Sequence, residues 1–300
     1  MERANDRGLA TADEGLELPA PSVQPPAPGP IHIEIRSTRP QLSAELRELW
    51  EHRELFYFLA WRDIKVRYKQ TVLGIAWAVL QPALTMIVFT LFFGKLARVP
   101  SDGVAYPLFA YAGILPWTLM AAGVGASSGS VVGSPNLITK VYFPRMIIPG
   151  AAVLSGLVDF LIAGIGLALL MTRYGGHVSW TLVGLVPVVG LILLLAAGVG
   201  GFLAAINVKY RDVRYIVPFF MQLWMFATPV IYSASLVPAR WRVFLALNPM
   251  ASYIEAFRAV CFDKPLDWTG LGLSTLVTFA MVAVAVRAFR TVEQTFADYI

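Results

Sequence analysis

Six long apolar stretches dominate this 300-residue chain and restrict what it can fold into. A helix that crosses the hydrocarbon core of a bilayer needs roughly 20 mostly apolar residues. Six runs reach that length, and only one of them contains an ionisable residue, Asp159: 70–94, 103–139, 146–172, 178–208, 215–239 and 268–286. These runs are continuously apolar and lack the alternating pattern of barrel strands. The sequence therefore predicts an all-α membrane protein with six transmembrane helices.

The distribution of charge excludes several classes of soluble protein. The first 69 residues hold 21 of the 43 charged side chains, which leaves 22 for the other 231 residues. An ordinary soluble domain carries roughly 25% charged residues, so a soluble enzyme is excluded. The net charge of +5 does not indicate nucleic-acid binding, because the basic residues flank apolar runs. Contact with anionic membrane lipids explains this excess better.

Basic residues in the short links predict the orientation. Six spans place both termini on one side of the membrane. With the N-terminus inside, eleven basic residues lie at the inner ends of the runs: Arg62, Lys65, Arg67, Lys69, Lys140, Arg145, Lys209, Arg211, Arg214, Arg287 and Arg290. Only Lys95, Arg98 and Arg173 lie in the two short outer links. The positive-inside rule therefore predicts that both termini are cytoplasmic.

The N-terminal part divides into a tail and a helix. Residues 19–30 contain six prolines, which predicts that 1–40 is a disordered, Pro-rich cytoplasmic tail. From 41 to 69 a helical period places apolar residues on one stripe: Leu42, Leu46, Leu49, Trp50, Tyr57, Trp61, Ile64 and Tyr68. Such a segment is too polar to span a membrane and is typical of an amphipathic interfacial helix. It could serve as a plain anchor or as a lateral gate.

The segment between the last two runs predicts short re-entrant helices. Residues 241–247, which include Arg242, and 251–262 are apolar stretches separated by Asn248 and Pro249. Their length suits re-entrant or interfacial helices rather than spans. Glu255 and Arg258 are three positions apart and could form an ion pair. A soluble loop that packs against the bundle is the alternative.

Catalytic and metal-binding patterns are not found. The single cysteine and three histidines form no ligand cluster, so no metal site or cofactor is expected in this chain. No GxxxxGK[ST] loop is present, so any ATP and Mg²⁺ would be used by a separate subunit. Asp159 within a span must face protein or water. It could be a structural hydrogen-bonding group, part of a polar pathway or a proton relay.

Aromatic and polar side chains in the first and fifth runs are candidates for lining a channel. Aromatic faces with a few polar groups suit the passage of sugar rings, and bundle packing or lipid contact is the alternative. The candidates are Trp77, Gln81, Phe219, Gln222, Trp224, Thr228 and Tyr232. The link 134–145 predicts a brief helix parallel to the membrane, on which Tyr142 and Phe143 could contact a soluble partner.

These motifs occur in an order that resembles a known family. RDIKVRY at 62–68, TPVIY at 228–232 and LNPM at 247–250 are the most specific pieces. Over about 45–295 the chain resembles the ABC-2 type permeases that export polysaccharides, namely the O-antigen, capsule and teichoic acid exporters. The resemblance implies that 70–300 is an ABC-2 type transmembrane domain and that 41–69 corresponds to the gate helix. It also implies that 134–145 is the coupling helix.

The same resemblance implies a set of partners. The chain would form a homodimer, bind two copies of a separate P-loop ATPase subunit and reside in the bacterial inner membrane. Its substrate would be a glycan linked to undecaprenyl diphosphate, and Arg62, Lys65, Arg67 and Lys69 would meet the diphosphate because arginine is a forked donor for phosphate oxygens. An ABC-2 exporter of drugs or lipids, a non-ABC channel and a membrane-embedded transferase are the alternatives.

Overall fold

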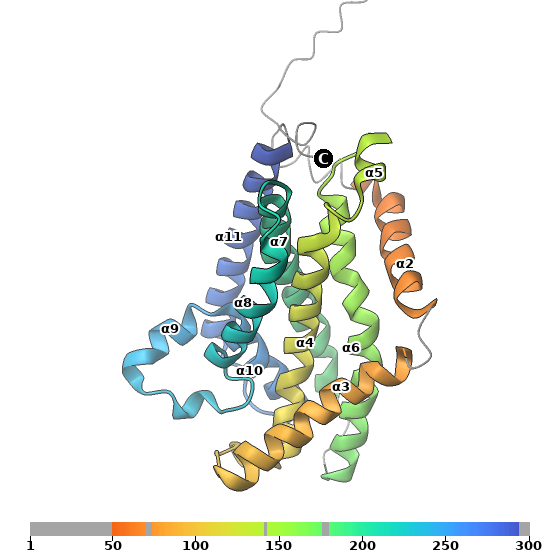
Figure 1. Cartoon of the computed structure of the whole chain (residues 1–300). Helices are drawn as coiled ribbons and strands as arrows, with labels where there is room; N and C mark the ends of the chain where they lie inside the picture. The colour runs from red at the N-terminus through yellow and green to blue at the C-terminus, as the bar shows by residue number, and fades with distance from the viewer. Residues whose placement is uncertain (1–49, 70–73, 141–142, 176–179, 294–300) are drawn as a thin grey trace, which may run out of the picture. The chain divides into compact units, whose positions relative to one another are not determined.

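The computed structural model describes residues 50–69, 74–140, 143–175 and 180–293, and every regular element within these ranges is a helix (Figure 1). Five helices are long and apolar enough to cross a membrane: Gly74–Leu96, Tyr106–Ser130, Ile147–Arg173, Trp180–Lys209 and Trp268–Val292. They coincide with five of the six predicted runs. The all-α membrane class is thereby confirmed. Residues 1–49, which hold the predicted tail and the first part of the predicted amphipathic helix, lie outside the described residues.

The fifth predicted span is the exception. Helix α8 (Val213–Ala227) has 15 residues and is about 22 Å long, which is less than the ~30 Å thickness of a hydrocarbon core. The apolar run continues to 239, but the helix ends earlier because Pro229 disfavours helical backbone at the residue before it. Thr228 accordingly has an extended backbone, with φ −107° and ψ 141°. The prediction of six full spans is therefore not confirmed.

Helix α4 (Tyr106–Ser130) is the centre of the bundle. It packs against α3 (Gly74–Phe89), α6 (Ile147–Arg173) and α7 (Leu185–Lys209), and most of its residues are buried. Small residues allow the closest contact, as in other membrane helices. A Cβ atom on Gly200 of α7 would lie 2.5 Å from the Cβ of Ser127 on α4. Helix α11 (Trp268–Glu293) packs on the other side of α7.

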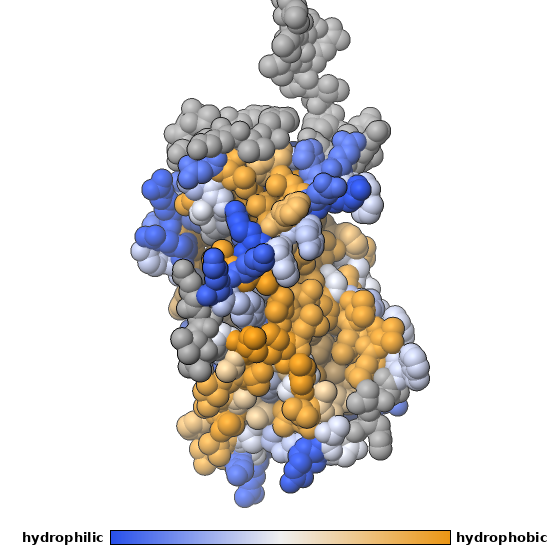
Figure 2. Space-filling model, turned by 90° about the vertical axis from the view of Figure 1, so that its right-hand side faces the viewer, coloured by the Kyte–Doolittle hydropathy of each residue, from blue (hydrophilic) through white to orange (hydrophobic). Residues whose placement is uncertain are grey.

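Helix α2 (Arg53–Lys69) packs beside α6 (Figure 1). Leu59 and Ala60 are buried there in a cluster that includes Ile147 of α6. Tyr57 and Trp61, two members of the predicted apolar stripe, are instead 61% and 45% exposed. Apolar side chains therefore lie on both sides of α2, and the expected single stripe is not confirmed. Figure 2, which views the α2 and α6 side, shows hydrophilic residues gathered above and a broad hydrophobic surface below.

Two short helices follow α8, as predicted. Helix α9 (Arg242–Ala246) and helix α10 (Pro249–Cys261) are separated at Asn248. The side chain of Asn248 caps α10 by accepting a hydrogen bond from the backbone N–H of Met250 at 3.2 Å, and Pro249 occupies the first turn, where its missing N–H costs nothing. Helix α10 is almost entirely buried and packs against α4, α7 and α11. It is thus an internal element of the bundle rather than a surface loop.

Candidate functional site

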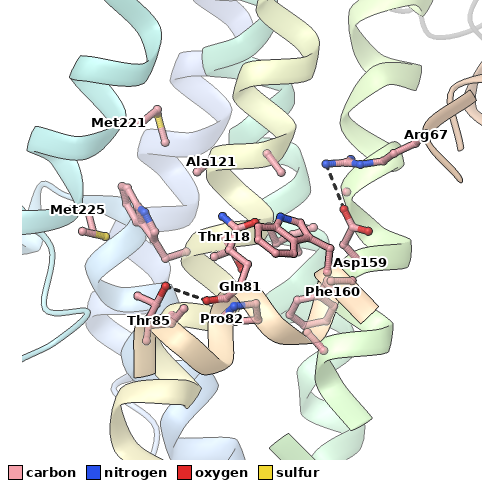
Figure 3. A pocket seen from close by; sticks show the side chains of 18 of the residues that line it. Arg67, Gln81, Pro82, Thr85, Thr118, Ala121, Asp159, Phe160, Met221 and Met225 are labelled. Atoms are coloured by element: carbon pink, nitrogen blue, oxygen red, sulfur yellow. Dashed lines mark hydrogen bonds and ion pairs between the residues drawn. The ribbon is translucent and has the colours of Figure 1, made fainter. Parts of the chain in front are cut away.

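A cavity of about 770 Å³ lies among α2, α3, α4, α6 and α8 (Figure 3). Apolar side chains that include Trp77, Trp117 and Phe160 form much of its wall. Polar groups are distributed among them: Arg67, Tyr68, Gln81, Thr85, Thr118, Asp159 and Gln222. Aromatic walls with a few polar groups are the usual composition of a ligand-binding cavity. The cavity is therefore the candidate substrate site.

Three of the seven predicted channel residues line this cavity. Trp77 and Gln81 contribute from α3, and Gln222 contributes from α8. The other four lie outside it: Phe219, Trp224, Thr228 and Tyr232. Phe219 is 63% exposed on α8, and the hydroxyl of Tyr232 donates to the carbonyl oxygen of Phe226 at 3.3 Å. Both expected residues of α3 therefore lie at the cavity, and of the five expected residues from 219 to 232 Gln222 alone lines it.

Asp159 is at the middle of α6 and both of its carboxylate oxygens contact α2. Oδ2 lies 3.1 Å from Nη2 of Arg67, and Oδ1 accepts a hydrogen bond from the hydroxyl of Tyr68. The side chains of Arg67 and Asp159 are 41% and 27% exposed, so the ion pair faces the cavity rather than the protein core. Of the three sequence-based interpretations of Asp159, the structure supports the hydrogen-bonding role, and the polar pathway and the proton relay stay predictions.

The surroundings of Tyr68 keep its hydroxyl protonated, as the hydrogen bond to Asp159 requires. Partial burial, together with the hydrogen bond to the Asp159 carboxylate, raises the pKa of Tyr68 to about 12. A phenol with this pKa keeps its proton at neutral pH. Tyr68 therefore donates a hydrogen bond to Asp159 at neutral pH.

The four basic residues predicted at the gate have different surroundings. Arg62 pairs with its neighbour Asp63, with Nε–Oδ1 and Nη2–Oδ1 distances of 3.0 and 2.9 Å. The ammonium of Lys65 lies 5.3 Å from the ring centroid of Trp61, and Lys69 is exposed at the end of α2. Of the four, only Arg67 lines the cavity. The structure therefore separates Arg67 from the other three.

Trp224, Thr228 and Asn248 form one hydrogen-bonded group. The indole N–H of Trp224 donates to Oδ1 of Asn248 at 3.0 Å, and Nδ2 of Asn248 donates to the hydroxyl of Thr228 at 2.9 Å. The Thr228 hydroxyl donates in turn to the carbonyl oxygen of Trp224 at 2.7 Å. Sequence reasoning assigned these residues to two different features, and the structure shows that they fasten the end of α8 to the start of α10.

Arg258 is buried at the broken end of α8. Its guanidinium donates to the carbonyl oxygens of Pro229 at 2.8 Å, Val230 at 2.5 Å and Phe109 at 3.2 Å. The expectation that it pairs with Glu255 is corrected, because the described residues contain no ion pair between these two side chains. The carbonyl groups freed where the helix stops need donors, and Arg258 supplies them. Glu255 and Arg258 both line a smaller pocket of about 190 Å³.

The link between α4 and α6 contains the short helix α5 (Pro135–Lys140), as predicted. Tyr142, one of the two residues expected to contact a soluble partner, lies outside the described residues. Phe143, the other, is only 4% exposed and packs with Leu59 and Ile147. Its expected role is therefore corrected, since a buried ring anchors the link and offers no docking surface. Pro135 and Asn136 are exposed at the start of α5.

Sequence reasoning missed three residues that shape these sites. Tyr106 donates its hydroxyl to the carbonyl oxygen of Ile231 at 2.8 Å and so helps to satisfy the segment after α8. A Cβ atom on Gly113 would lie 2.4 Å from Nη2 of Arg258. Tyr68 was assigned to an apolar stripe. Its position next to Arg67, in a segment rich in basic residues, was the one available signal of a polar role.

Arg242 and Pro249, also predicted in the re-entrant region, have local roles. Nε of Arg242 donates to the carbonyl oxygen of Val237 at 3.2 Å, and the side chain is otherwise exposed. Pro249 begins α10. Neither lines the 770 Å³ cavity.

Most of the described helical bundle is similar in sequence to known proteins. Residues 54–262, from the start of α2 to the residue after α10, match the ABC-2 type transporter family. The O-antigen export system permease protein RfbA of Myxococcus xanthus is 34% identical over 261 residues, which are 85% of this chain and 98% of that protein. An O-antigen export system permease protein RfbA of Klebsiella pneumoniae is 24% identical over 82% of this chain and 94% of its own length. The polysialic acid transport protein KpsM of Escherichia coli is 21% identical over 78% and 91%.

Proposed function

This chain belongs to the ABC-2 type transporter family, and we propose that it is the membrane permease subunit of an exporter for a lipid-linked polysaccharide of the O-antigen or capsule type. The observation that carries the proposal is the similarity to the Myxococcus xanthus permease, which extends over 98% of that protein. The family match over residues 54–262 includes every residue that lines the cavity, together with nearly all of α2 and all of α10. The relatives reported above are named for O-antigen export or for polysialic acid transport.

The permease works with other chains. Two copies of this subunit form a homodimer and two copies of a separate P-loop ATPase bind at the cytoplasmic side, where ATP and Mg²⁺ are used. The exposed apolar faces of α3 and α8 are the surfaces that we assign to the second copy, and lipid covers the rest of the apolar surface. The exposed start of α5 is the surface that we assign to the ATPase, in place of Phe143.

The protein resides in the bacterial inner membrane with both termini in the cytoplasm. The charge asymmetry of the short links supports this orientation. In this orientation α2 and α5 are at the cytoplasmic side, and the 190 Å³ pocket beside α10 is at the outer side. A substrate made in the cytoplasm therefore reaches the α2 end of the cavity first.

The substrate is a glycan attached to a polyprenyl lipid through a diphosphate, of which undecaprenyl diphosphate is the bacterial form. The aromatic and amide side chains of the cavity suit sugar rings, whose apolar faces stack and whose hydroxyls form hydrogen bonds. The basic end of α2 suits the diphosphate, because charge-assisted hydrogen bonds to phosphate oxygens are strong.

Deleting the gene in its native host tests the proposal. We expect surface polysaccharide to disappear, lipid-linked glycan to accumulate inside the cell, and both changes to be reversed by the wild-type chain. Extraction of the glycan followed by gel analysis measures both pools. Unchanged surface polysaccharide, or a phenotype restricted to drug sensitivity, would exclude polysaccharide export and favour an ABC-2 exporter of another substrate.

A further inference from the structure

We propose that Arg67 and Tyr68 form a binding site for the diphosphate group of the transported lipid, and that Asp159 occupies this site in the absence of substrate. The inference rests on the proposed function and assigns its headgroup site to two residues. Asp159 acts as an internal substitute for the phosphate, so that substrate binding is an exchange of one anion for another. The exchange also releases α2 from α6.

The geometry at Asp159 resembles anion recognition. Each carboxylate oxygen has its own donor, a guanidinium nitrogen for Oδ2 and a phenol for Oδ1. Both donors come from consecutive residues at the end of α2, while the acceptor is 91 residues from Tyr68 on another helix. The contact is therefore both an occupied anion site and a polar tether of α2.

An anion that enters the cavity can reach the Arg67–Asp159 ion pair. The side chains of Arg67 and Asp159 are 41% and 27% exposed and both line the 770 Å³ cavity. Figure 3 shows Arg67 reaching Asp159 from the side, with Thr118 and Gln81 across the cavity. A lipid headgroup at the end of α2 would meet the guanidinium at the mouth of the space that receives the glycan.

The chemistry favours exchange by a phosphate over exchange by a second carboxylate. A carboxylate carries one negative charge, whereas a diphosphate esterified at both ends carries two, one on each phosphorus, and each phosphorus offers two non-bridging acceptor oxygens. Arg67 uses a single nitrogen on Asp159, and the described residues provide no other hydrogen-bond acceptor for its guanidinium. A diphosphate can engage the planar fork of the guanidinium in a bidentate manner. The substrate thus offers Arg67 more contacts than Asp159 does.

Exchange also explains why an acid is present within a span at all. An ionised carboxylate at that depth is unfavourable unless it is paired or hydrated. Once Arg67 turns to the substrate, Asp159 is left facing a cavity with the hydroxyl of Thr118 and the amide of Gln81 on its walls. A neutral residue at 159 would remove the ion pair that holds Arg67 against α6 and leave α2 attached there by its apolar packing alone. With Asp159 present, Arg67 and Tyr68 leave α6 only when another anion replaces the carboxylate.

Binding of a soluble isoprenyl diphosphate to the full-length chain, assembled with its ATPase in nanodiscs, tests the proposal. The probe is farnesyl diphosphate, and farnesol and inorganic pyrophosphate are separate arms that distinguish a lipid headgroup from free phosphate. Asp159→Asn should tighten farnesyl diphosphate binding roughly fivefold or more, the lower range of typical coupling between sites. Arg67→Gln should abolish the gain, so that the double variant binds no better than Arg67→Gln alone.

A matched control removes the general effect of negative charge. Asp63→Asn deletes another α2 carboxylate that is paired with an arginine, but that pair lies away from the cavity. It should change affinity less than twofold. An equal gain from Asp63→Asn, no gain from Asp159→Asn, or a gain that persists without Arg67 would overturn the proposal. Pyrophosphate binding equal to that of farnesyl diphosphate would overturn the assignment to a lipid headgroup.

Distance measurement gives a second readout in case Asp159→Asn does not fold. Spin labels at the exposed positions Tyr57 on α2 and Leu161 on α6 report the separation of the two helices. Farnesyl diphosphate should increase this separation in the otherwise wild-type protein, and Asp159→Glu should retain the response. An unchanged distance overturns the exchange. Polysaccharide export is measured separately in cells, so export without diphosphate-dependent movement refutes this inference and leaves the proposed function intact.

Discussion

The guanidinium of Arg258 in α10 donates to the main-chain oxygen of Val230 at 2.5 Å, immediately after the point where α8 ends. The carbonyl groups of residues 229 and 230 lack helical partners because Pro229 interrupts the helix. One buried side chain therefore allows an apolar run to stop after 15 helical residues without leaving unsatisfied backbone in the bundle. The short α8 and the buried α10 depend on each other through this contact.

Replacing Arg258 should consequently destabilise the fold. In Arg258→Leu the carbonyl oxygens of 109, 229 and 230 lose a donor, and each buried polar group left unpaired costs about 1–3 kcal/mol. We expect a loss of at least about 3 kcal/mol in the free energy of unfolding measured in detergent, with Arg258→Lys intermediate. The control Arg242→Leu removes an exposed arginine and should change stability by less than about 0.5 kcal/mol.

Gly113 should tolerate no side chain. A Cβ atom there would lie 2.4 Å from both Nη2 of Arg258 and the carbonyl oxygen of Val230. Gly113→Ala should therefore destabilise by about 1–3 kcal/mol through overpacking. Gly125, on the same helix, has no atom within 4 Å of the corresponding position. Gly125→Ala should be neutral or stabilising in the same thermal unfolding measurement, and equal losses in both variants would contradict the packing explanation.

Much of this architecture follows from simple rules of sequence. Five of the six spans predicted from run length are present, because the hydrophobic requirement of a bilayer acts on composition alone. The pair of short helices was predictable because Asn248 and Pro249 form a recognisable helix start. The early end of α8 was not predicted, since a count of charge-free residues does not register a proline that stops the helix while the run remains apolar.

The polar contacts were harder to predict for a different reason. Arg258 binds main-chain oxygens, which every residue has, so no side-chain pattern reveals its partners. The Tyr68–Asp159 contact joins residues 91 positions apart, and an acid in one span gives no indication of which segment packs against it. The burial of Phe143 likewise depends on α2 packing over the link. Tertiary packing, rather than local pattern, decides these three cases.

Asn248 should act as a joint between α8 and α10. Asn248→Ala removes the helix cap and both side-chain contacts, to Trp224 and to Thr228, and should cost about 2 kcal/mol in total. Asn248→Asp keeps the acceptor for the cap and for the indole and should lose less. A double-mutant cycle with Thr228→Val should give a coupling of about 0.5 kcal/mol or more, and strictly additive losses would show that the pair is independent.

Cysteine labelling should show which residues of the link 134–145 are buried and which are exposed to the ATPase. Because Phe143 is buried and Asn136 is exposed, Phe143→Cys should resist a membrane-impermeant maleimide in inside-out vesicles, whereas Asn136→Cys should react. Binding of the ATPase should then protect Asn136→Cys. Rapid labelling at 143, or labelling at 136 that the ATPase does not affect, would contradict this assignment.

Filling the cavity should impede transport without disturbing the fold. Ala121 of α4 projects into the 770 Å³ space in Figure 3, so an indole at this position can be accommodated with little strain. Ala121→Trp should reduce surface polysaccharide by more than half while membrane insertion, thermal stability and ATPase binding stay near wild type. Leu161→Trp is the matched control, because Leu161 is 60% exposed on α6 and outside the cavity. If Ala121→Trp exports as well as Leu161→Trp, the glycan does not pass through this cavity, and the route must instead be formed where two copies of the chain meet.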